Sequence, residues 1–302
     1  MDDVAWTRRQ LAQLESDAIA QRAALRPGLQ WHDRVIRADD RAPAVTVRIY
    51  EHDRVSRPCG ALLFFHGGAF VLGGLESEHE RCLRWAQHGE CVVVSVDYRL
   101  APEHPYPAAL NDGAAALAWL RENSASIGVD PQRIAVGGAS AGGALAAGLA
   151  LRTRDQQGPW LKAQILVYPV IDDRTATKSM EQFFQIEPWD AERTAKMWSH
   201  YLGDNLVDVS PYAAVGRATD LSDLPATYIM TAEEDPLRDE GIAYAQRLLD
   251  AGTSVELHHY ARTFHGFDVV APGSTLSELA ITEQSAFIQR ALAIRTAERG
   301  SL

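Results

Sequence analysis

The stretch RIAVGGASAGGALAAGL, residues 133–149, constrains the fold of this chain more than any other segment. An apolar run is followed at once by a glycine-flanked serine and then by a run of small residues. Gly138, Ser140 and Gly142 form a G-x-S-x-G pattern, in which a serine is held on a tight turn between a strand and a helix. Such a turn strains the serine backbone and leaves almost no room for side chains two residues away.

A glycine-serine turn can also be a simple connector, so the pattern needs the right structural context. Here residues 134–136 read as a buried strand, and residues 144–151 read as a helix that can pack tightly on a sheet. This context favours Ser140 as a nucleophile.

Apolar runs alternate with helix-like segments along most of the chain. The runs are continuously apolar, which predicts strands buried on both faces and therefore a mostly parallel sheet covered by helices. Such a sheet binds ligands at the carboxyl ends of its strands. The alternating residues 45–50 instead predict an antiparallel edge strand. Further strands are expected at 61–65, 91–96, 164–170, 226–232 and 255–260, and helices at about 78–87, 107–123, 239–251 and 276–297.

Two segments depart from this alternation. Residues 4–25 have apolar side chains at helical spacing, which predicts an amphipathic helix before Pro27. Residues 172–223 contain helical pieces and no convincing strand, so we expect a lid over the strand ends. Its aromatic residues are expected mainly to pack the lid onto the body, with the lining of an acyl pocket as the alternative: Phe183, Phe184, Trp189, Trp198 and Tyr201.

The formal net charge of −11 disfavours nucleic acid or an anionic membrane as a partner and leaves small neutral substrates open. The first ten residues include four charged side chains and no continuous apolar run, and no long apolar stretch follows, so we expect a soluble cytoplasmic protein without stable membrane association. Cys59, Cys82 and Cys91 are odd in number and have no metal-binding spacing, which predicts reduced structural thiols.

A nucleophilic serine needs an imidazole to take its proton and a carboxylate to orient that imidazole. His265 lies in TFHGFD, just after the predicted strand at 255–260, where it would stand at a carboxyl strand end. His258 and His259 lie within that strand. The other histidines considered lie in surface-like contexts and are expected to be exposed: His32, His52, His79, His88, His104 and His200.

The carboxylate is expected in TAEEDPLRDEG, directly after the predicted strand at 226–232. We assign Asp235, because Pro236 makes a turn just past the strand end. Glu233 and Glu234 remain alternatives. Asp239 and Glu240 are expected to open the next helix as favourable first-turn charges. The resulting order of serine, aspartate and histidine is that of the α/β-hydrolases.

The loop HGGAF, residues 66–70, follows the predicted strand at 61–65 and offers a nearly bare backbone at another strand end. The N–H groups of Gly68 and Ala69, together with that of Ala141, could stabilise an oxyanion, each donor contributing about 2.7 to 4 kcal/mol. A phosphate-binding loop is the alternative. Neither the G-x-x-x-x-G-K-[ST] nor the G-x-G-x-x-G pattern is present to support it.

The chain resembles the bacterial hormone-sensitive-lipase-like esterases of the α/β-hydrolase fold, from about residue 45 to its end. The resemblance rests on HGGAF, DYRLAPEHPYPAALND (97–112), GGASAGG (137–143), DPLRDEG (235–241) and FHGF (264–267). YRLAPEHPYPAA is the most specific of these motifs. The resemblance implies a single domain over residues 1–302, with a helical cap formed by about 1–40 and 172–218.

The resemblance also implies a carboxylesterase acting on a small ester of short to medium chain length, without metal or cofactor, and a possible homodimer. An amidase or a specialised acyl hydrolase could use the same residues. Members that bind without hydrolysis, such as the plant gibberellin receptors, have lost the catalytic histidine, whereas this chain keeps His265. By resemblance, the triad is Ser140, Asp235 and His265, and the oxyanion hole comprises Gly67, Gly68, Ala69 and Ala141, with Gly67 shaping the HGGAF loop.

Two positions depart from the family pattern. Ala139 stands where many members have an acidic residue, which removes a possible polar contact. Ala69 replaces the third glycine of H-G-G-G, which keeps the backbone donor but takes a little room from the pocket. Arg99 and Glu103 are expected to form a structural charge pair under the site.

Overall fold

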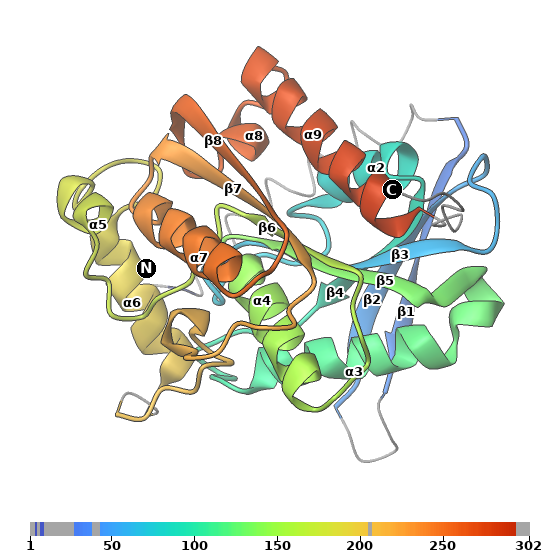
Figure 1. Ribbon diagram of the computed structural model, residues 1–302, viewed down its shortest axis with the longest axis horizontal. Helices are drawn as coiled ribbons and strands as arrows, with labels where there is room; N and C mark the ends of the chain where they lie inside the picture. Colours follow the sequence, from blue (N-terminus) through green and yellow to red (C-terminus); the bar gives the residue numbers. More distant parts are fainter. Residues whose placement is uncertain (1–3, 5–6, 9–26, 38–42, 205–206, 294–302) are drawn as a thin grey trace, which may run out of the picture.

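A computed structural model describes residues 4, 7–8, 27–37, 43–204 and 207–293. These residues contain one eight-stranded sheet of order β1-β2-β4-β3-β5-β6-β7-β8 (Figure 1). The β1–β2 and β2–β4 pairs are antiparallel, and every other pair is parallel. The strands are β1 (Leu29–Ile36), β2 (Val45–His52), β3 (Cys59–Phe65), β4 (Cys91–Asp97), β5 (Val129–Ala139), β6 (Ala163–Val167), β7 (Ala226–Glu234) and β8 (Val255–Phe264).

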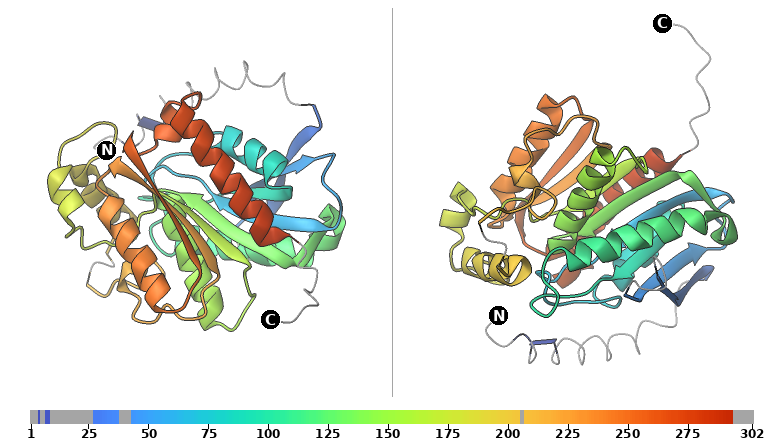
Figure 2. Two further views of the ribbon diagram at one scale, coloured as in Figure 1. Left: turned by 45° about the horizontal axis from the view of Figure 1, so that its top comes forward. Right: turned by 90° about the horizontal axis from the view of Figure 1, so that it is seen from below.

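Helices cover both faces of the sheet, as Figure 2 shows. Side chains alternate across each strand, so β3 sends Leu63 and Phe65 to one apolar core and Leu62 and Phe64 to another. The first core includes α3 (Ala108–Glu122), α4 (Ala141–Asp155) and α7 (Arg238–Asp250), and the second includes α2 (His79–His88) and α9 (Thr275–Leu292). The predicted α/β-hydrolase architecture, a mostly parallel sheet flanked by helices, is therefore confirmed.

The antiparallel direction of the strand over residues 45–50 is confirmed, but its edge position is wrong. Strand β1 pairs along the whole length of β2 and forms the edge itself. The polar residues of β2 do not all face solvent. Arg48 is buried, because its guanidinium forms ion pairs with Asp33 of β1 at 2.6 Å and with Glu76 at 2.6 Å.

Other element boundaries differ slightly from the sequence-based expectation. Strand β6 ends at Val167, because Tyr168 adopts a positive φ of 35° and turns the chain. The last helix ends at Leu292, and the final residues predicted for it, 294–297, lie outside the described part of the chain. Most of the predicted helix over residues 4–25 also lies outside it.

The segment between residues 172 and 223 contains α5 (Lys178–Gln182), α6 (Ala191–Leu202) and the short helix η2 (Val215–Arg217). Its described residues, which omit 205–206, include no strand. Trp198 and Tyr201 are buried, and Tyr201 stacks on Phe70 of the body with ring centroids 3.7 Å apart. Phe183 is buried as well, whereas Phe184 is 55% exposed, contrary to expectation. A cap made of about residues 1–40 and 172–218 remains a prediction.

The predicted pair between Arg99 and Glu103 is wrong. Arg99 instead forms an ion pair at 2.7 Å with Asp112 on α3, which also accepts a hydrogen bond from the Arg99 backbone N–H. Glu103 pairs with Arg8 at 2.8 Å. The partner of Arg99 is therefore chosen by how α3 packs rather than by proximity in the sequence.

The three cysteines are free and buried, as predicted. Within the described residues, no helix combines the length and the apolar character needed to cross a membrane.

Candidate active site

Ser140 lies in the turn between β5 and α4 with φ 55° and ψ −118°, a strained backbone for a residue with a side chain. The flanking glycines have no room for a methyl group. A Cβ on Gly138 would lie 2.1 Å from the Gly142 carbonyl oxygen, and one on Gly142 would lie 2.0 Å from the Phe65 carbonyl oxygen. The G-x-S-x-G pattern is therefore required by contacts between backbone atoms.

Ser140, Asp235 and His265 follow the ends of β5, β7 and β8, three strands of the same parallel sheet. The sheet brings their side chains together at its carboxyl edge. The His265 Nε2 atom lies 2.9 Å from the Ser140 Oγ atom, and the His265 Nδ1 atom lies 2.8 Å from the Asp235 Oδ2 atom. These contacts form one unbroken hydrogen-bond path from carboxylate to hydroxyl.

Asp235 determines how the imidazole is protonated. Its side chain is 1% exposed, and its second oxygen accepts a hydrogen bond from the Leu237 N–H at 2.9 Å. A carboxylate oxygen accepts hydrogen bonds, so the arrangement favours the tautomer in which His265 Nδ1–H donates to Asp235. In that tautomer the Nε2 atom faces the Ser140 hydroxyl as an acceptor.

The alternative carboxylates and histidines lie elsewhere. Glu233 accepts a hydrogen bond from the Arg262 N–H at 2.6 Å, and Glu234 is exposed. His52 and His79 are buried rather than exposed, and His79 lies 3.0 Å from the Tyr50 hydroxyl, away from the serine. The remaining histidines that were expected at the surface are exposed or partly exposed: His32, His88, His104 and His200.

The HGGAF loop lies directly against the serine. A Cβ on Gly67 would be 3.3 Å from the Ala139 carbonyl oxygen and 3.7 Å from the Ser140 Cβ. Gly68 and Ala69 both have positive φ, 121° and 56°. Within the described residues, no turn or loop carbonyl accepts a hydrogen bond from either of their N–H groups.

Ala141 is the first residue of α4, where backbone N–H groups have no partner inside the helix. The sheet therefore brings the loop of Gly67, Gly68 and Ala69 to the same strand edge as the N-terminus of this helix. The residues whose N–H groups are expected to bind an oxyanion therefore lie in two segments that adjoin Ser140.

His66 supports this loop, a role that the sequence analysis missed. Its Nδ1–H donates to the Gly67 carbonyl at 2.7 Å, and its ring stacks on Tyr98 with centroids 4.2 Å apart. The Tyr98 hydroxyl in turn donates to the His66 carbonyl at 2.8 Å. Burial lowers the pKa of His66 to about 4, so the ring is neutral at ordinary pH. The sequence signal that could have indicated this role was the position of His66 immediately before Gly67.

Two aromatic rings flank the imidazole of His265. The Tyr168 ring centroid lies 4.7 Å from it, and the Trp189 ring centroid lies 6.0 Å from it. All three aromatic residues of α6 and the turn before it lie between β6 and β7, but only Trp189 stands beside His265, whereas Trp198 and Tyr201 pack against Phe70 of the body.

Comparison with known proteins gives the family. A family model described as the alpha/beta hydrolase fold matches residues 62–269. Esterase LipI from Mycobacterium tuberculosis is 40% identical over 251 residues, which cover 82% of this chain and 77% of that protein. The chain belongs to the hormone-sensitive-lipase-like family of α/β-hydrolases.

Solved structures of related esterases agree with this assignment. Esterase LipW from Mycobacterium marinum matches with a TM-score of 0.90 at 41% identity, over 95% of this chain and 90% of that one. A bacterial heroin esterase matches with a TM-score of 0.91 at 41% identity, over 97% and 93%. This hormone-sensitive-lipase-like protein is an enzyme that hydrolyses carboxylic esters, as the sequence analysis predicted.

Proposed function

We propose that this enzyme is a serine carboxylesterase that hydrolyses esters of short to medium acyl chain length through a covalent acyl-enzyme. The observation that carries the proposal is the hydrogen-bond path from Asp235 through His265 to Ser140, with contacts of 2.8 and 2.9 Å. A hydroxyl, an imidazole and a carboxylate in this order form the triad of serine hydrolases.

In the proposed reaction, His265 takes the Ser140 proton as the serine oxygen attacks the ester carbonyl. Asp235 stabilises the imidazolium that results. The N–H groups of Gly68, Ala69 and Ala141 stabilise the oxyanion, in a loop shaped by Gly67. His265 then gives its proton to the leaving alcohol, and a water molecule activated by the same imidazole hydrolyses the acyl-enzyme. No step needs a metal or cofactor.

The preference for shorter acyl groups rests on the segment at 172–218, which we propose forms the cap together with residues 1–40. Trp198 and Tyr201 of this segment pack against the body. Trp189 stands beside His265. A large aromatic ring next to the imidazole restricts the space for a long chain.

The test is a Ser140→Ala variant assayed with p-nitrophenyl esters from acetate to palmitate and with a fluorophosphonate probe. We expect Ser140→Ala to lose at least about 10⁴-fold in kcat and all labelling. Ser126→Ala is the matched control and should retain both, because this exposed serine lies before the amino end of β5, opposite the end that carries Ser140. Wild-type rates in Ser140→Ala would contradict the proposed nucleophile.

The same assays separate the alternatives. An amidase would cleave p-nitroanilides faster than the matching esters, and a protein that only binds would not be labelled by the probe. A rate maximum at palmitate would contradict the proposed chain-length preference. The predicted homodimer is tested by light scattering after gel filtration.

A further inference from the structure

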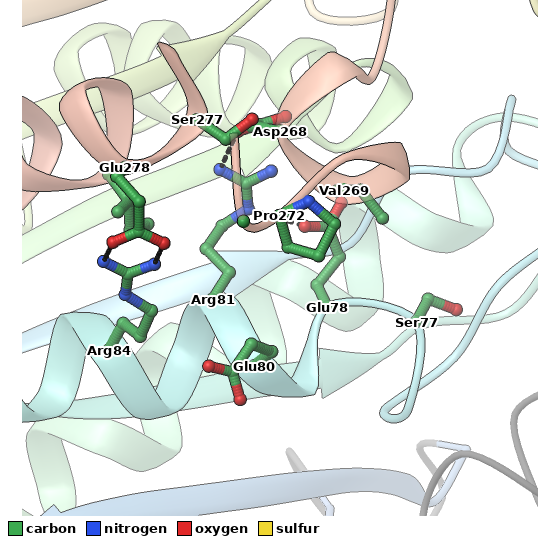
Figure 3. Close-up of a pocket in the computed structure, with 12 residues that line it drawn as sticks. Ser77, Glu78, Glu80, Arg81, Arg84, Asp268, Val269, Pro272, Ser277 and Glu278 are labelled. Carbon is green, nitrogen blue, oxygen red and sulfur yellow. Dashed lines mark hydrogen bonds and ion pairs between the residues drawn. The ribbon is translucent and has the colours of Figure 1, made fainter. Parts of the chain in front are cut away.

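Four buried polar side chains lie next to the segment that carries His265. Glu78 lies at the N-terminus of α2 and Arg81 within it, Tyr168 follows β6, and Asp268 lies on α8 (Phe267–Val270). We call this set the Arg81 cluster. Its members Glu78, Arg81 and Asp268 form part of the wall of a cavity of about 410 Å³ between α2, α8 and α9, and in Figure 3 Arg81 points toward Asp268.

The members of the Arg81 cluster are joined by direct hydrogen bonds. Arg81 donates to Glu78 at 2.6 Å, to Asp268 at 2.9 Å and to the Tyr168 hydroxyl oxygen at 3.1 Å. The Tyr168 hydroxyl donates to Asp268 at 2.8 Å. The Arg81 and Asp268 side chains are each only 4% exposed. Buried charges of this kind are stable only when they are paired, so loss of one partner disturbs the others.

Because Tyr168 stays protonated, the directions of its hydrogen bonds in the Arg81 cluster are fixed. Burial, reinforced by the negative charge of Asp268, raises the pKa of Tyr168 well above its usual value, so the phenol keeps its proton. A protonated phenol can both accept from Arg81 and donate to Asp268.

Tyr168 and Asp268 connect the Arg81 cluster to His265 in two ways. Asp268 lies three residues after His265 on the same short segment. The ring of Tyr168 lies against the imidazole, with centroids 4.7 Å apart and planes at 59°. The hydroxyl of that ring is bound to Asp268, so the backbone that carries the imidazole and the ring that contacts it are tied together.

Close packing does little to hold this segment. A Cβ on Gly266 or Gly273 would meet no atom within 4 Å, and Val269 and Val270 are 45% and 63% exposed. Phe267 is buried and provides an apolar anchor at one point. Beside this cavity, the hydrogen bonds of Asp268 to Arg81 and Tyr168 tie the segment to α2 and to the residue that follows β6.

We propose that Asp268, held by Arg81 and Tyr168, is a positioning residue that keeps the imidazole of His265 aligned with the Ser140 hydroxyl. The proposal rests on the proposed function, because it takes His265 as the general base. Misplacement of a reacting group by about 1 Å can reduce a rate by about 100-fold, so a small rotation of the imidazole would be measurable.

The test compares Asp268→Asn and Tyr168→Phe with Arg84→Gln. Arg84 lies on α2, as Arg81 does, and pairs with Glu278 of α9 at 2.6 Å in the wall of the same cavity (Figure 3). We expect Asp268→Asn to lower kcat for p-nitrophenyl acetate by about 10- to 100-fold, with KM changed by less than about threefold. Tyr168→Phe, which keeps the ring, should lose about three- to tenfold, and Arg84→Gln less than about twofold.

A readout at the imidazole separates positioning from a merely structural role. The low-field proton resonance of the His265 Nδ1–H should broaden or shift in Asp268→Asn and Tyr168→Phe, and remain in Arg84→Gln. A structural role would lower the melting temperature while leaving this resonance and the kcat per folded molecule unchanged. That result, in a folded Asp268→Asn protein, would overturn the proposal.

If Asp268→Asn does not fold, Tyr168→Phe decides. A wild-type kcat and an unchanged resonance in that variant would also overturn the proposal. Failure of the proposed function is recognised separately, because in that case Ser140→Ala keeps its activity and its probe labelling whatever the cluster variants do.

Discussion

Ser140 and His265 are held in place by different forces. Around Ser140, backbone atoms touch so closely that Cβ atoms on the neighbouring glycines would lie about 2 Å from carbonyl oxygens. Around His265, the segment that follows has open space, exposed valines and a cavity of about 410 Å³, and it is bound by the Arg81 cluster. Steric repulsion positions Ser140, whereas charge and hydrogen bonding position His265.

The two regions should therefore respond to different changes. Repulsion between atoms rises steeply with overlap, so the serine turn tolerates no added volume and is indifferent to charge. Buried ion pairs tolerate small changes of volume and are sensitive to the removal of one charge.

The largest expected effect comes from a methyl group added beside Ser140, and the comparison is a methyl group added to the segment after His265. Gly142→Ala places a Cβ 2.0 Å from the Phe65 carbonyl oxygen. This oxygen belongs to the backbone of β3 and cannot move away. We expect a loss of more than about 4 kcal/mol of folding free energy, or no folded protein. Gly273→Ala enters open space and should change stability by less than about 0.5 kcal/mol. Thermal and urea unfolding measure both; equal effects would contradict the comparison.

A smaller effect is expected from the titration of His66, the first residue of the HGGAF loop. Its pKa is about 4 in the folded protein and near 6.5 when unfolded, so between these values the unfolded chain binds a proton that the folded protein does not. Stability should therefore fall as pH falls from 6.5 to 4, by roughly 3 kcal/mol from this residue.

The measurement for His66 is urea unfolding of wild type and His66→Asn at several pH values. Asparagine keeps an N–H donor for the Gly67 carbonyl but loses the ring that stacks on Tyr98, so the variant should be less stable at pH 7. Because asparagine does not titrate, the variant should lose less folding free energy on acidification. Parallel curves for the two proteins would contradict the prediction.

The next prediction concerns Trp189 and the space for an acyl chain beside His265. Trp189→Ala removes a ring whose centroid lies 6.0 Å from the imidazole centroid, so longer acyl groups gain space. The ratio of kcat/KM for hexanoate over acetate esters should rise by about three- to tenfold, with a stability loss of about 1 to 2 kcal/mol. Trp160→Ala, a 61% exposed tryptophan, is the control and should leave the ratio unchanged. An unchanged ratio in Trp189→Ala would show that this ring does not limit the space for the acyl group.

The smallest effect is expected at Ala69. Its φ of 56° favours glycine, so Ala69→Gly relieves strain while the flexibility of glycine in the unfolded chain offsets part of the gain. We expect a stability change between zero and about +1 kcal/mol and an unchanged kcat, because the N–H donor remains. Ala139→Gly, in strand β5 without positive φ, should instead lose about 0.5 to 1 kcal/mol. A loss at Ala69 as large as that at Ala139 would contradict the strain argument.

Much of the fold was predictable because its signals are local. Continuous apolar runs marked the parallel strands, and the glycines around Ser140 marked a turn whose contacts lie within a few residues and one neighbouring strand. The carboxyl ends of such strands meet at one edge, so residues just after β7 and β8 could be selected without coordinates.

Pairings across long stretches of sequence were not predictable in this way. Arg99 binds Asp112 instead of Glu103, because α3 presents that carboxylate to it. His79 packs against Trp31 of β1. The alternating sequence of the neighbouring strand β2 did not reveal that β1 would pair with it. Local pattern does not determine which distant polar groups meet.

The order of the strands and helices, the strained serine and the bare backbone of the HGGAF loop were determined by the sequence itself, since each depends on the conformational limits of a few adjacent residues. Only the tertiary structure decided that Arg81 reaches Asp268, 187 residues away, beside the histidine. A buried charge takes whichever partner the packed helices bring within reach, and that choice is made by the whole fold.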